Sequence, residues 1–449
     1  MRILVVGGGG REHALCWKLA RSPRKPDLYC APGNAGTASL AENVAIEPND
    51  LAGLLAFSRN ESIDLTVVGP EDPLCAGIVD QFTAAGLRIF GPTAAAARIE
   101  GDKAFAKKLM REAGIPTADA RVFEPTAQEV AQALQAGKGP DEEHPPEYQT
   151  GYDLAREYVA TRSEGVVVKA CGLAQGKGVF VHEDPSDALI TLERLMVQGE
   201  LGEAGTRIII EDILKGREVS VLALVDGQTI YLLESAADHK RLGEQDTGPN
   251  TGGMGAVSPS GRLSEADLKA IESDVFVPIV DALHREGVTY QGVLYAGLML
   301  TAGGPKVLEF NCRFGDPETQ PILMRLKSDL VEAMEATVDG RLSEIELVWD
   351  QRTALCVVMA SGGYPGPYEK GKPIEGLEAA ANMEQVEVFH AGTTIGPEGV
   401  LTAGGRVLGI TALGDSLQAS RDRAYEAAGL VTFDGARMRG DIGMKTSQR

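Results

Sequence analysis

The sequence predicts a multidomain protein of mixed α/β and α+β class that begins with a doubly wound parallel-sheet domain. Its 449 residues exceed what a single hydrophobic core usually serves. Strand-like and helix-like segments alternate over residues 1–101, and a smaller α+β pattern occupies residues 340–449. These observations leave residues 102–339 as a central domain.

Residues 1–101 divide into short apolar runs separated by longer amphipathic segments. We expect strands at 2–6, 28–31, 44–46, 63–68 and 88–90, and helices at 12–20, 50–57 and 74–85. Strands and helices that alternate in this way form a parallel sheet with helices on both faces.

The central and carboxyl-terminal domains have different patterns. The central domain is expected to open with a basic helix at 103–112 and to end with a helix at 329–337. The carboxyl-terminal domain is expected to contain strands at 354–359, 385–389 and 406–412 and a helix at 417–428. Residues 137–162 combine paired prolines and clustered acids with a short helical stretch at 153–161, and we expect them to be an insertion.

The composition excludes several classes of partner. Lys and Arg number 43 against 64 Asp and Glu, so the formal net charge of −21 disfavours binding to nucleic acid or to anionic membranes. The first apolar run is too short for a signal peptide, and no apolar run is long enough to span a bilayer. The six cysteines form no Cys-x-x-Cys pair, so neither a disulfide framework nor a zinc site is indicated. The expected location is the reducing cytoplasm.

The most informative stretch is residues 307–320, where an apolar run ends in alternating polar side chains. On a strand, Glu309, Asn311 and Arg313 would share one face, while Leu308 and Phe310 would point to the other. Carboxylate and amide oxygens are ligands that Mg²⁺ accepts beside nucleotide phosphates, and an Arg can grip a phosphoryl oxygen. The alternative is a strand that carries surface charges. The length of the run favours a site for a metal-bound nucleotide.

Residues 313–320 read Arg-Phe-Gly-Asp-Pro-Glu-Thr-Gln, which resembles the characteristic segment of the phosphoribosylamine–glycine ligases, a family of the ATP-grasp superfamily. Similar segments follow in family order along nearly the whole chain. They lie at 9–14, 31–36, 91–93, 176–178, 246–255, 390–393, 404–407 and 441–443. Only residues 137–162 fall clearly outside the resemblance.

The resemblance implies a central ATP-grasp domain and a specific reaction. Members of the family ligate glycine to 5-phosphoribosylamine and convert ATP to ADP and phosphate through a glycyl phosphate, in de novo purine biosynthesis. By this resemblance, Arg313, Lys240 and Asp316 are catalytic, and Glu309 and Asn311 hold Mg²⁺ or Mn²⁺. We also expect a monomer, since the sequence shows no sign of an obligate protein partner.

A glycine-rich loop at 172–178 lies between expected strands at 166–169 and 179–181. It is not a Walker loop, because the stretch from Gly172 to Lys177 is one residue short and Gly178 stands where Ser or Thr would bind magnesium. A Gly-rich hairpin tip can still fold over a triphosphate. The resemblance assigns the following residues to ATP: Lys103, Lys169, Gly176, Lys177, Gly178, Glu211, Leu214 and Glu218.

Four glycines at 7–10 follow the first strand, where a helix start often binds phosphate. A dinucleotide site is disfavoured because Glu12 and His13 stand where a third glycine belongs, and residues 31–33 supply no acid for a ribose. In the resembled family this loop helps to receive phosphoribosylamine, whose 5′-phosphate would pair with Arg11. The residues that the resemblance assigns to the two substrates are Gly9, Gly10, Arg11, Asn34, Asp246, Thr247 and Asn250.

One position departs from the family. Residues 169–171 read Lys-Ala-Cys where the family usually reads Lys-Ala-Asp, so a thiol stands near cationic side chains. Such surroundings favour a reactive thiolate, which bound MgATP would shield from alkylation, although isolated cysteines are more often buried and inert.

Two other functions stay open from the sequence. Another ATP-grasp ligase, such as a biotin-dependent carboxylase subunit, would need a carrier lysine flanked by methionines, and Met444-Lys445 supplies only half of that motif. A nucleotide-binding protein that had lost turnover is the second alternative. The presence of Glu309, Asn311 and Arg313 argues against it.

Overall fold

The computed structural model describes residues 1–124, 150–174, 178–397 and 399–444. Two compact units can be distinguished. Unit 1 comprises Met1–Ala97, Glu218–Leu298 and Phe310–Arg449, and unit 2 comprises Arg98–Arg217 and Met299–Glu309. Among the described residues, no helix has both the length and the apolar character needed to cross a bilayer.

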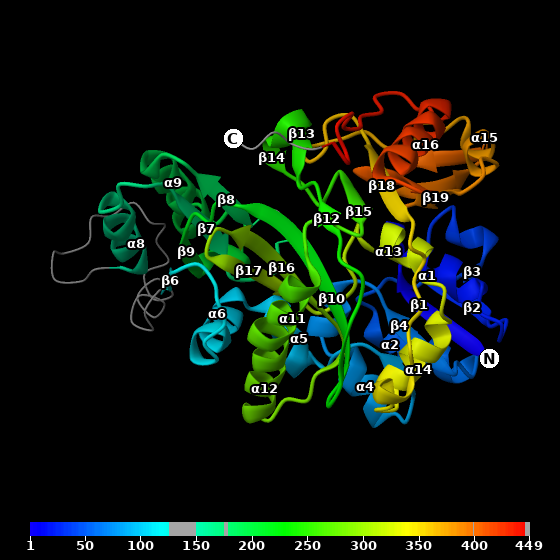
Figure 1. The fold of residues 1–449 in the computed structure, drawn as a ribbon, viewed down its shortest axis with the longest axis horizontal. Coiled ribbons are helices and arrows are strands. Elements are labelled where there is room, and N and C mark those ends of the chain that lie inside the picture. Colours follow the sequence, from blue (N-terminus) through cyan, green and yellow to red (C-terminus); the bar gives the residue numbers. More distant parts are fainter. Residues whose placement is uncertain (125–149, 175–177, 398, 445–449) are drawn as a thin grey trace. The chain divides into compact units, whose positions relative to one another are not determined.

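The amino-terminal part of unit 1 is a five-stranded parallel sheet (Figure 1). Its strand order is β3-β2-β1-β4-β5, which confirms the predicted parallel sheet. The region predicted as one helix at 74–85 is two helices, because Gly77 adopts a left-handed φ of 86° between them. The elements are β1 (Arg2–Gly7), α1 (Gly10–Ala20), β2 (Asp27–Pro32), β3 (Glu42–Asn43), α2 (Leu51–Asn60), β4 (Leu65–Val68), α3 (Glu71–Cys75), α4 (Ile78–Ala84), β5 (Ile89–Phe90) and α5 (Ala94–Gly101).

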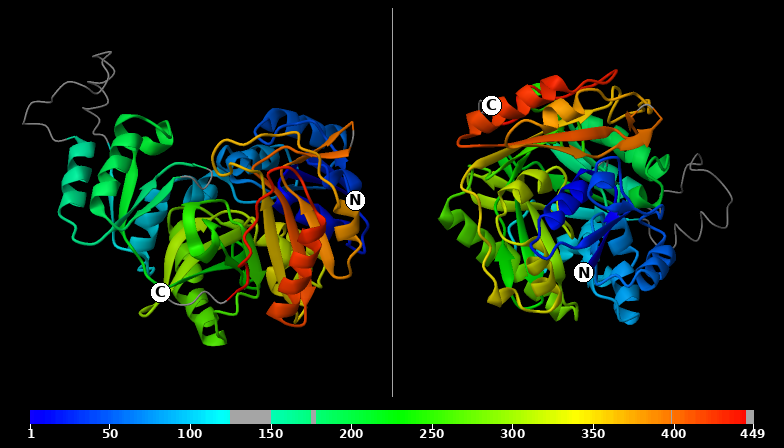
Figure 2. Two further views of the ribbon diagram at one scale, coloured as in Figure 1. Left: turned by 90° about the horizontal axis from the view of Figure 1, so that it is seen from above. Right: turned by 90° about the vertical axis from the view of Figure 1, so that its right-hand side faces the viewer.

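A second five-stranded sheet, of order β12-β15-β18-β22-β19, forms the carboxyl-terminal part of unit 1. Strands β18 (Thr353–Ala360), β19 (Val386–His390) and β22 (Arg406–Gly414) lie where the sequence predicts them. Figure 2 shows α16 (Leu417–Leu430) lying along strands of this sheet. Strands β12 (Ala237–Asp238) and β15 (Gly255–Ser258) come from the central part of the chain, and the sequence analysis did not anticipate them.

The remaining elements of unit 1 surround an apolar core that includes side chains of α1, β1, α13 and α14. Strands β10, β11, β16 and β17 form a four-stranded sheet of order β11-β10-β16-β17, and β13 pairs with β14. The four-stranded sheet is not confined to unit 1, because residues 299–309 of β16 and β17 are assigned to unit 2. The helix predicted at 329–337 is α14. The bounds are β10 (Arg217–Asp226), β11 (Ile230–Leu232), β13 (Arg241–Gly243), β14 (Thr247–Asn250), α11 (Glu265–Ile271), α12 (Val277–Arg285), β16 (Gln291–Thr301), β17 (Gly304–Asn311), α13 (Thr319–Arg325), α14 (Leu330–Val338), α15 (Leu377–Ala381), β20 (Thr393–Gly396) and β21 (Gly399–Thr402).

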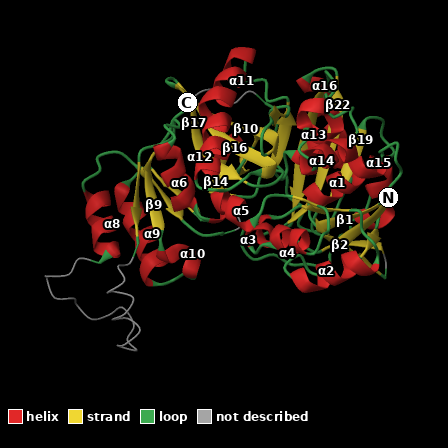
Figure 3. Cartoon of the chain, turned by 90° about the horizontal axis from the view of Figure 1, so that it is seen from below, coloured by secondary structure: helices red, strands yellow, loops and turns green. Residues whose placement is uncertain are grey.

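Unit 2 is built on an antiparallel sheet of order β6-β9-β7-β8, with α8 and α9 against it (Figure 3). The expected short helix at 153–161 is confirmed as α8, which buries Ala155 and Val159 in the core, whereas residues 137–149 lie outside the described residues. The elements are α6 (Lys103–Glu112), β6 (Ala120–Phe123), α8 (Gly151–Ala160), β7 (Val166–Ala170), β8 (Val179–His182), α9 (Pro185–Leu192), α10 (Glu203–Thr206) and β9 (Ile208–Asp212).

Helix α9 offers a matched pair of substitutions that tests the core of unit 2. Leu192 is fully buried, whereas Ile190 on the same helix is 58% exposed. We expect Leu192→Ala to destabilise the unit by about 2–5 kcal/mol, because it leaves a cavity. The control Ile190→Ala should change stability by less than about 0.5 kcal/mol. Hydrogen exchange of the β9 amides measures the difference, and equal protection in both variants would contradict this core assignment.

Candidate active site

The glycine loop after β1 makes room for a buried carboxylate. A Cβ on Gly7 would lie 2.5 Å from Glu12 Cγ, and a Cβ on Gly69 would also overlap the Glu12 side chain. Glu12 accepts hydrogen bonds from the Gly9 backbone N–H and from Nε of Arg11, both at 2.6 Å. Glu12 therefore lies between the carboxyl ends of β1 and β4, at the point where doubly wound folds usually receive dinucleotide phosphates. This agrees with the exclusion of a dinucleotide site.

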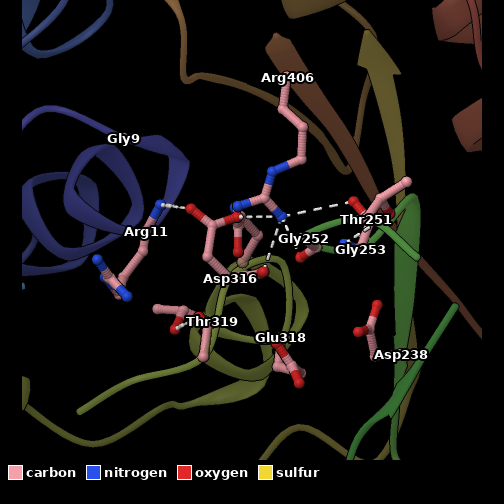
Figure 4. Close-up of polar contacts among 12 residues, drawn as sticks. Gly9, Arg11, Asp238, Thr251, Gly252, Gly253, Asp316, Glu318, Thr319 and Arg406 are labelled. Atoms are coloured by element: carbon pink, nitrogen blue, oxygen red, sulfur yellow. Dashed lines mark hydrogen bonds and ion pairs between the residues drawn. The ribbon is translucent and has the colours of Figure 1, made fainter. Parts of the chain in front are cut away.

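Asp316 lies at the amino-terminal end of α1. Its Oδ2 accepts a hydrogen bond from the backbone N–H of Arg11 at 3.1 Å. Its Oδ1 accepts a hydrogen bond from Nε2 of Gln320 at 3.3 Å and lies 3.4 Å from Nη1 of Arg406. Burial alone would raise the pKa of Asp316, but the guanidinium groups of Arg406 and Arg11 hold it below its usual value. Figure 4 shows the carboxylate between these two arginines. An ionised carboxylate is favoured here because the helix start carries partial positive charge.

Arg313 is held in an ion pair with Glu71 from the start of α3. Its Nε lies 3.0 Å from Glu71 Oε2, and its Nη1 donates to the Phe314 carbonyl at 3.2 Å. Burial opposes ionisation of Glu71, but Arg313 and Arg11 lower the pKa of this carboxyl to about 2. Because Arg11 also donates to the Phe314 carbonyl, at 3.0 Å, two sequence-predicted site residues meet on the same loop.

Lys240 lies near Glu218, a residue that the resemblance assigns to the ribose of ATP. The Lys240 Nζ is 3.5 Å from Glu218 Oε2, and both side chains are partly exposed. Asp238 is close by, and burial together with the charge of Glu318 raises its pKa above the usual value. Glu318 accepts hydrogen bonds from the hydroxyls of Ser220 and Tyr295, both at 2.9 Å. Unit 1 thus brings four ionisable side chains together, those of Glu218, Asp238, Lys240 and Glu318, and Lys240 offsets part of the negative charge.

The hairpin of β13 and β14 carries three predicted substrate residues. Asp246 is ion-paired through Oδ1 with Nη1 of the buried Arg439 at 2.8 Å. Thr247 is exposed and its hydroxyl donates to the Glu244 carbonyl at 2.8 Å, while Asn250 ends β14 half-buried. The structure therefore brings these three residues onto one hairpin.

Asn34 and Gly10 have roles in packing. The Asn34 amide donates to the carbonyls of Gly8 and His390 at 3.0 and 2.9 Å, and its oxygen accepts two backbone N–H groups at 2.8 and 3.0 Å. A Cβ on Gly10 would lie 2.7 Å from Nε2 of Gln320. Asn34 thus links the glycine loop after β1 to His390, and the absence of a side chain at Gly10 leaves room for Gln320.

Unit 2 contains a buried cluster of lysines around one carboxylate. Glu211 accepts Nζ of Lys107 and of Lys169, at 2.9 and 2.8 Å, and Lys169 also donates to the Leu308 carbonyl at 2.9 Å. Burial favours the neutral acid, but the two lysines lower the pKa of Glu211. Lys103 donates to the Gly172 carbonyl at 3.1 Å; burial lowers its pKa, and the charge of Glu309 partly opposes this. The cluster therefore holds the amino groups of these lysines at fixed positions within unit 2.

The other predicted nucleotide and metal residues lie on three segments. Gly178 is buried at the start of β8, and Leu214 follows β9 half-buried. Glu309 and Asn311 lie on β17 and are half-buried, whereas Phe310 between them is 2% exposed. Gly176 and Lys177 lie outside the described residues.

The chain matches three family models in sequence order. They are described as the N domain, the ATP-grasp (A) domain and the C domain of phosphoribosylglycinamide synthetase, and they match residues 1–100, 146–319 and 354–445. A phosphoribosylamine–glycine ligase of Rhodopirellula baltica is 50% identical over 444 residues, which cover 99% of this chain and 97% of that protein. The chain belongs to the phosphoribosylamine–glycine ligase family. It is therefore a ligase of purine biosynthesis that binds ATP through an ATP-grasp domain.

Solved structures agree with the three-domain architecture. The crystal structure of a Thermotoga maritima phosphoribosylamine–glycine ligase superposes with a TM-score of 0.78 and 32% identity, and covers 98% of this chain and 100% of that chain. The biotin carboxylase domain of a Hydrogenobacter thermophilus 2-oxoglutarate carboxylase, crystallised with MgADP, gives a TM-score of 0.70 at 13% identity, and covers 97% and 91% of the two chains. At this identity the second likeness shows the fold alone.

Sequence reasoning missed several residues of this ligase that pair with the predicted ones. Lys107 could have been found, because it lies one helical turn after Lys103 and so shares its face. Glu71 follows a buried strand in the segment Gly-Pro-Glu-Asp-Pro, and polar residues at the carboxyl ends of parallel strands are candidates for a site. The pairing of Arg439 with Asp246 had no signal, because 193 positions separate the two residues.

Cys171 corrects one expectation from the sequence. The thiol is 1% exposed, and burial raises its pKa to about 11 although Arg207 and Lys103 lie close enough to oppose the shift. Of the two interpretations that the sequence left open, the buried and inert cysteine is confirmed and the reactive thiolate is wrong, because desolvation of the charged form outweighs the cationic neighbours. That bound MgATP shields Cys171 from alkylation stays a prediction.

Alkylation rates test this reversal with an internal control. A pKa near 11 leaves roughly one thiol in a thousand ionised at pH 8. We expect iodoacetamide to label Cys171 at least about tenfold more slowly than the partly exposed Cys75, and labelling should rise as the pH approaches 11. Mass-spectrometric mapping over time gives both rates from one sample. Equal rates at pH 8 would contradict the assignment, and both cysteines should react alike in denaturant.

Proposed function

We propose that the chain catalyses the reaction ATP + glycine + 5-phospho-β-D-ribosylamine → ADP + phosphate + glycinamide ribonucleotide. The observation that carries this proposal is the continuous segment 309–316. It bears the expected metal ligands on β17 and then Arg313 and Asp316, which contact Glu71 and Arg11 of the amino-terminal sheet. The residues proposed to bind the metal, the phosphoryl group and the substrate thus lie within eight positions of one another.

The chemistry begins with a carboxylate that is a poor electrophile. A glycine carboxylate oxygen attacks the γ-phosphorus of ATP, the bond to the β-phosphate oxygen breaks, and ADP leaves. The amine of phosphoribosylamine then attacks the acyl carbon of glycyl phosphate, phosphate leaves, and the nitrogen loses a proton. The protein's task is to align the reactants and to neutralise the transferred charge.

The cationic cluster of unit 2 fits a nucleotide. Glu211 pairs with Lys107 and Lys169, and the charges of Glu309 and Glu100 act on Lys103, so a polyphosphate would bring further negative charge to these three lysines. Their hydrogen bonds to Glu211 and to backbone carbonyls hold the ammonium groups in place before ATP arrives, which lowers the cost of reorganisation. We propose that Gly176, Lys177, Gly178, Leu214 and Glu218 complete the nucleotide site.

The residues present also fit a hard cation with few protein ligands. The described residues contain no group of three or more His, Cys, Asp or Glu side chains able to hold a metal. Mg²⁺ suits such a chain, because it commonly binds one or two protein oxygens and completes its shell with water and nucleotide phosphates. We propose that Glu309 and Asn311 hold it, with Mn²⁺ as a substitute. The bound ion would neutralise charge on the phosphate oxygens.

In unit 1, we propose that Arg313 stabilises the transferred phosphoryl group. Glu71 fixes the orientation of its guanidinium, so the group is preorganised. Lys240 and Asp316 are the other proposed catalytic residues. The residues proposed to receive the two substrates are Gly9, Gly10, Arg11, Asn34, Asp246, Thr247 and Asn250.

We propose that the enzyme works in the cytoplasm as a monomer without nucleic-acid, membrane or protein partners. The six cysteines are free thiols, which suits a reducing compartment. Sedimentation velocity tests the monomer, and a stable dimer would contradict it.

The purified chain tests the reaction directly. With phosphoribosylamine generated in place, we expect ADP release to require glycine and to match glycinamide ribonucleotide formation mole for mole. AMP and pyrophosphate as main products would indicate an adenylating ligase. Glycine-independent ADP release without ligation would contradict the proposal.

Glu309→Gln tests the metal assignment. The change removes a charge from a half-buried strand position and little packing, so the fold should persist while ligation falls roughly a hundredfold or more. Lys306→Gln on the same strand is the control and should keep most of the activity. Initial rates across a Mg²⁺ titration give the comparison, and more than about a tenth of wild-type activity in Glu309→Gln would refute a metal role.

A further inference from the structure

The loop of residues 239–254, here called the substrate loop, connects two strands of the carboxyl-terminal sheet. The strand before it, β12, pairs with the strand after it, β15, and β15 pairs with β18 in register from Gly255 opposite Val357 to Ser258 opposite Ala354. The loop carries Lys240, Asp246 and further residues proposed to act on the substrates. Its two ends are therefore fixed by a domain to which sequence reasoning assigned no site residue.

Arg406, the first residue of β22, reaches from this sheet to the substrate loop. Its Nη1 donates to the Asp316 carbonyl at 2.8 Å and also to the Gly252 carbonyl, with the Gly253 carbonyl at 3.4 Å and the Asp316 carboxylate at 3.4 Å. A Cβ on Gly252 would lie 2.9 Å from the guanidinium carbon, so only glycine leaves room for this contact. Figure 4 shows the guanidinium between the substrate loop and Asp316.

The contact of Arg406 continues to the proposed catalytic lysine. The Gly252 N–H donates to the hydroxyl of Tyr364 at 3.0 Å, and the Gly253 N–H donates to the Thr251 hydroxyl at 3.0 Å. Thr251 in turn donates twice to the Lys240 carbonyl, through its N–H and its hydroxyl, both at 2.8 Å. A shift of the 252–253 segment would therefore be felt at the backbone of Lys240.

A second arginine of the carboxyl-terminal domain holds the other half of the loop. Arg439 is 1% exposed, and its Nη1 donates to the Arg241 carbonyl at 3.0 Å and to Asp246 at 2.8 Å. Asp441 binds Arg439 through both oxygens, at 2.7 and 2.8 Å, and also accepts the Gln245 N–H at 2.8 Å. Gln245 and Asp246 both adopt a left-handed φ of 55°, so this turn needs such external contacts to persist.

We propose that Arg406 is a positioning residue, which sets the conformation of the substrate loop and of Asp316 for catalysis, with Arg439 as the second anchor. This inference rests on the proposed function, because the loop matters only if its residues act on the substrates. Arg406 does not touch the reacting atoms in this scheme. Its known acceptors are three backbone carbonyls and one carboxylate of the protein itself, so its charge is already used to hold loops.

Arg406→Ala tests the proposal. Misplacement of reacting groups by about 1 Å can cost roughly a hundredfold, so we expect kcat/KM for glycine to fall roughly 10- to 100-fold. The binding constant for ADP should change less than about twofold, because the hydrogen-bond partners of Arg406, at Gly252, Gly253 and Asp316, are not among the residues proposed to bind nucleotide. Hydrogen exchange of the peptide that contains residues 251–254 should accelerate. Arg406→Lys keeps the charge and should recover part of the activity.

Chemical rescue distinguishes positioning from general stability. Millimolar guanidinium should restore several-fold activity to Arg406→Ala by occupying the space left by the side chain, and it should not stimulate the wild type. Arg437→Ala is the matched control, because Arg437 is exposed in the same domain, with no side-chain hydrogen bond or ion pair among the described residues. It should match the wild type in activity, exchange and response to guanidinium.

Tyr364→Phe keeps the test decisive if Arg406→Ala does not fold. Loss of the hydroxyl that accepts the Gly252 N–H should accelerate exchange at 251–254 and lower kcat/KM about 3- to 10-fold, the effect of one hydrogen bond. Unchanged kinetics and exchange in either variant overturn the proposal, as does lost activity with neither local exchange nor rescue. A wild type that cannot form glycinamide ribonucleotide defeats the proposed function instead, and the exchange data would then still report on the loop contacts.

Discussion

The ionised carboxylate of Asp316 is the contact on which the candidate site of unit 1 depends. A buried charge is stable only when it is paired and hydrogen-bonded. Asp316 meets this condition with the first turn of α1, with Gln320, and with Arg406. These partners belong to the amino-terminal, central and carboxyl-terminal parts of the chain. The carboxylate therefore holds together three segments that are remote in sequence, close to Arg313, which Glu71 orients.

In unit 2 the buried charges that need partners are those of lysines, and the partner is a carboxylate. Glu211 lies between Lys107 and Lys169, and this pairing offsets part of the cost of burying the three charges. A lysine cluster without such an acid would lose protons on burial and would bind phosphate less well. Because the acid is already in place, the lysine amino groups are held at fixed positions before a nucleotide arrives. Both units thus use buried ion pairs to fix charges at defined positions.

Much of the fold could be predicted because its signals are local. Strands β1, β2 and β4 and those at 353–360 and 406–414 are apolar runs of ordinary length, and α6, α14 and α16 have helical spacing. Strand β3 was predicted at 44–46 but lies at Glu42–Asn43, because two polar residues give no strand signal of their own. Strands β12 and β15 could not be predicted, because segments of two and four residues carry no periodic pattern. The break at Gly77 was likewise not predicted, because a single glycine within a helical pattern does not show that its φ will be left-handed. The same holds for the proposed site: Arg313 and Asp316 were predicted together because they are near neighbours in sequence.

The sequence by itself determined the family, the domain order and the chemical types at the proposed site, because these depend on motifs that a few adjacent residues carry. Only the tertiary structure decided which charges meet. Arg313 pairs with Glu71 across 242 positions, and Arg406 reaches Asp316 across 90. It also decided ionisation, as the raised pKa of Cys171 demonstrates. The physical reason is that pairing and desolvation depend on distances and burial in space, which no local pattern of residues specifies.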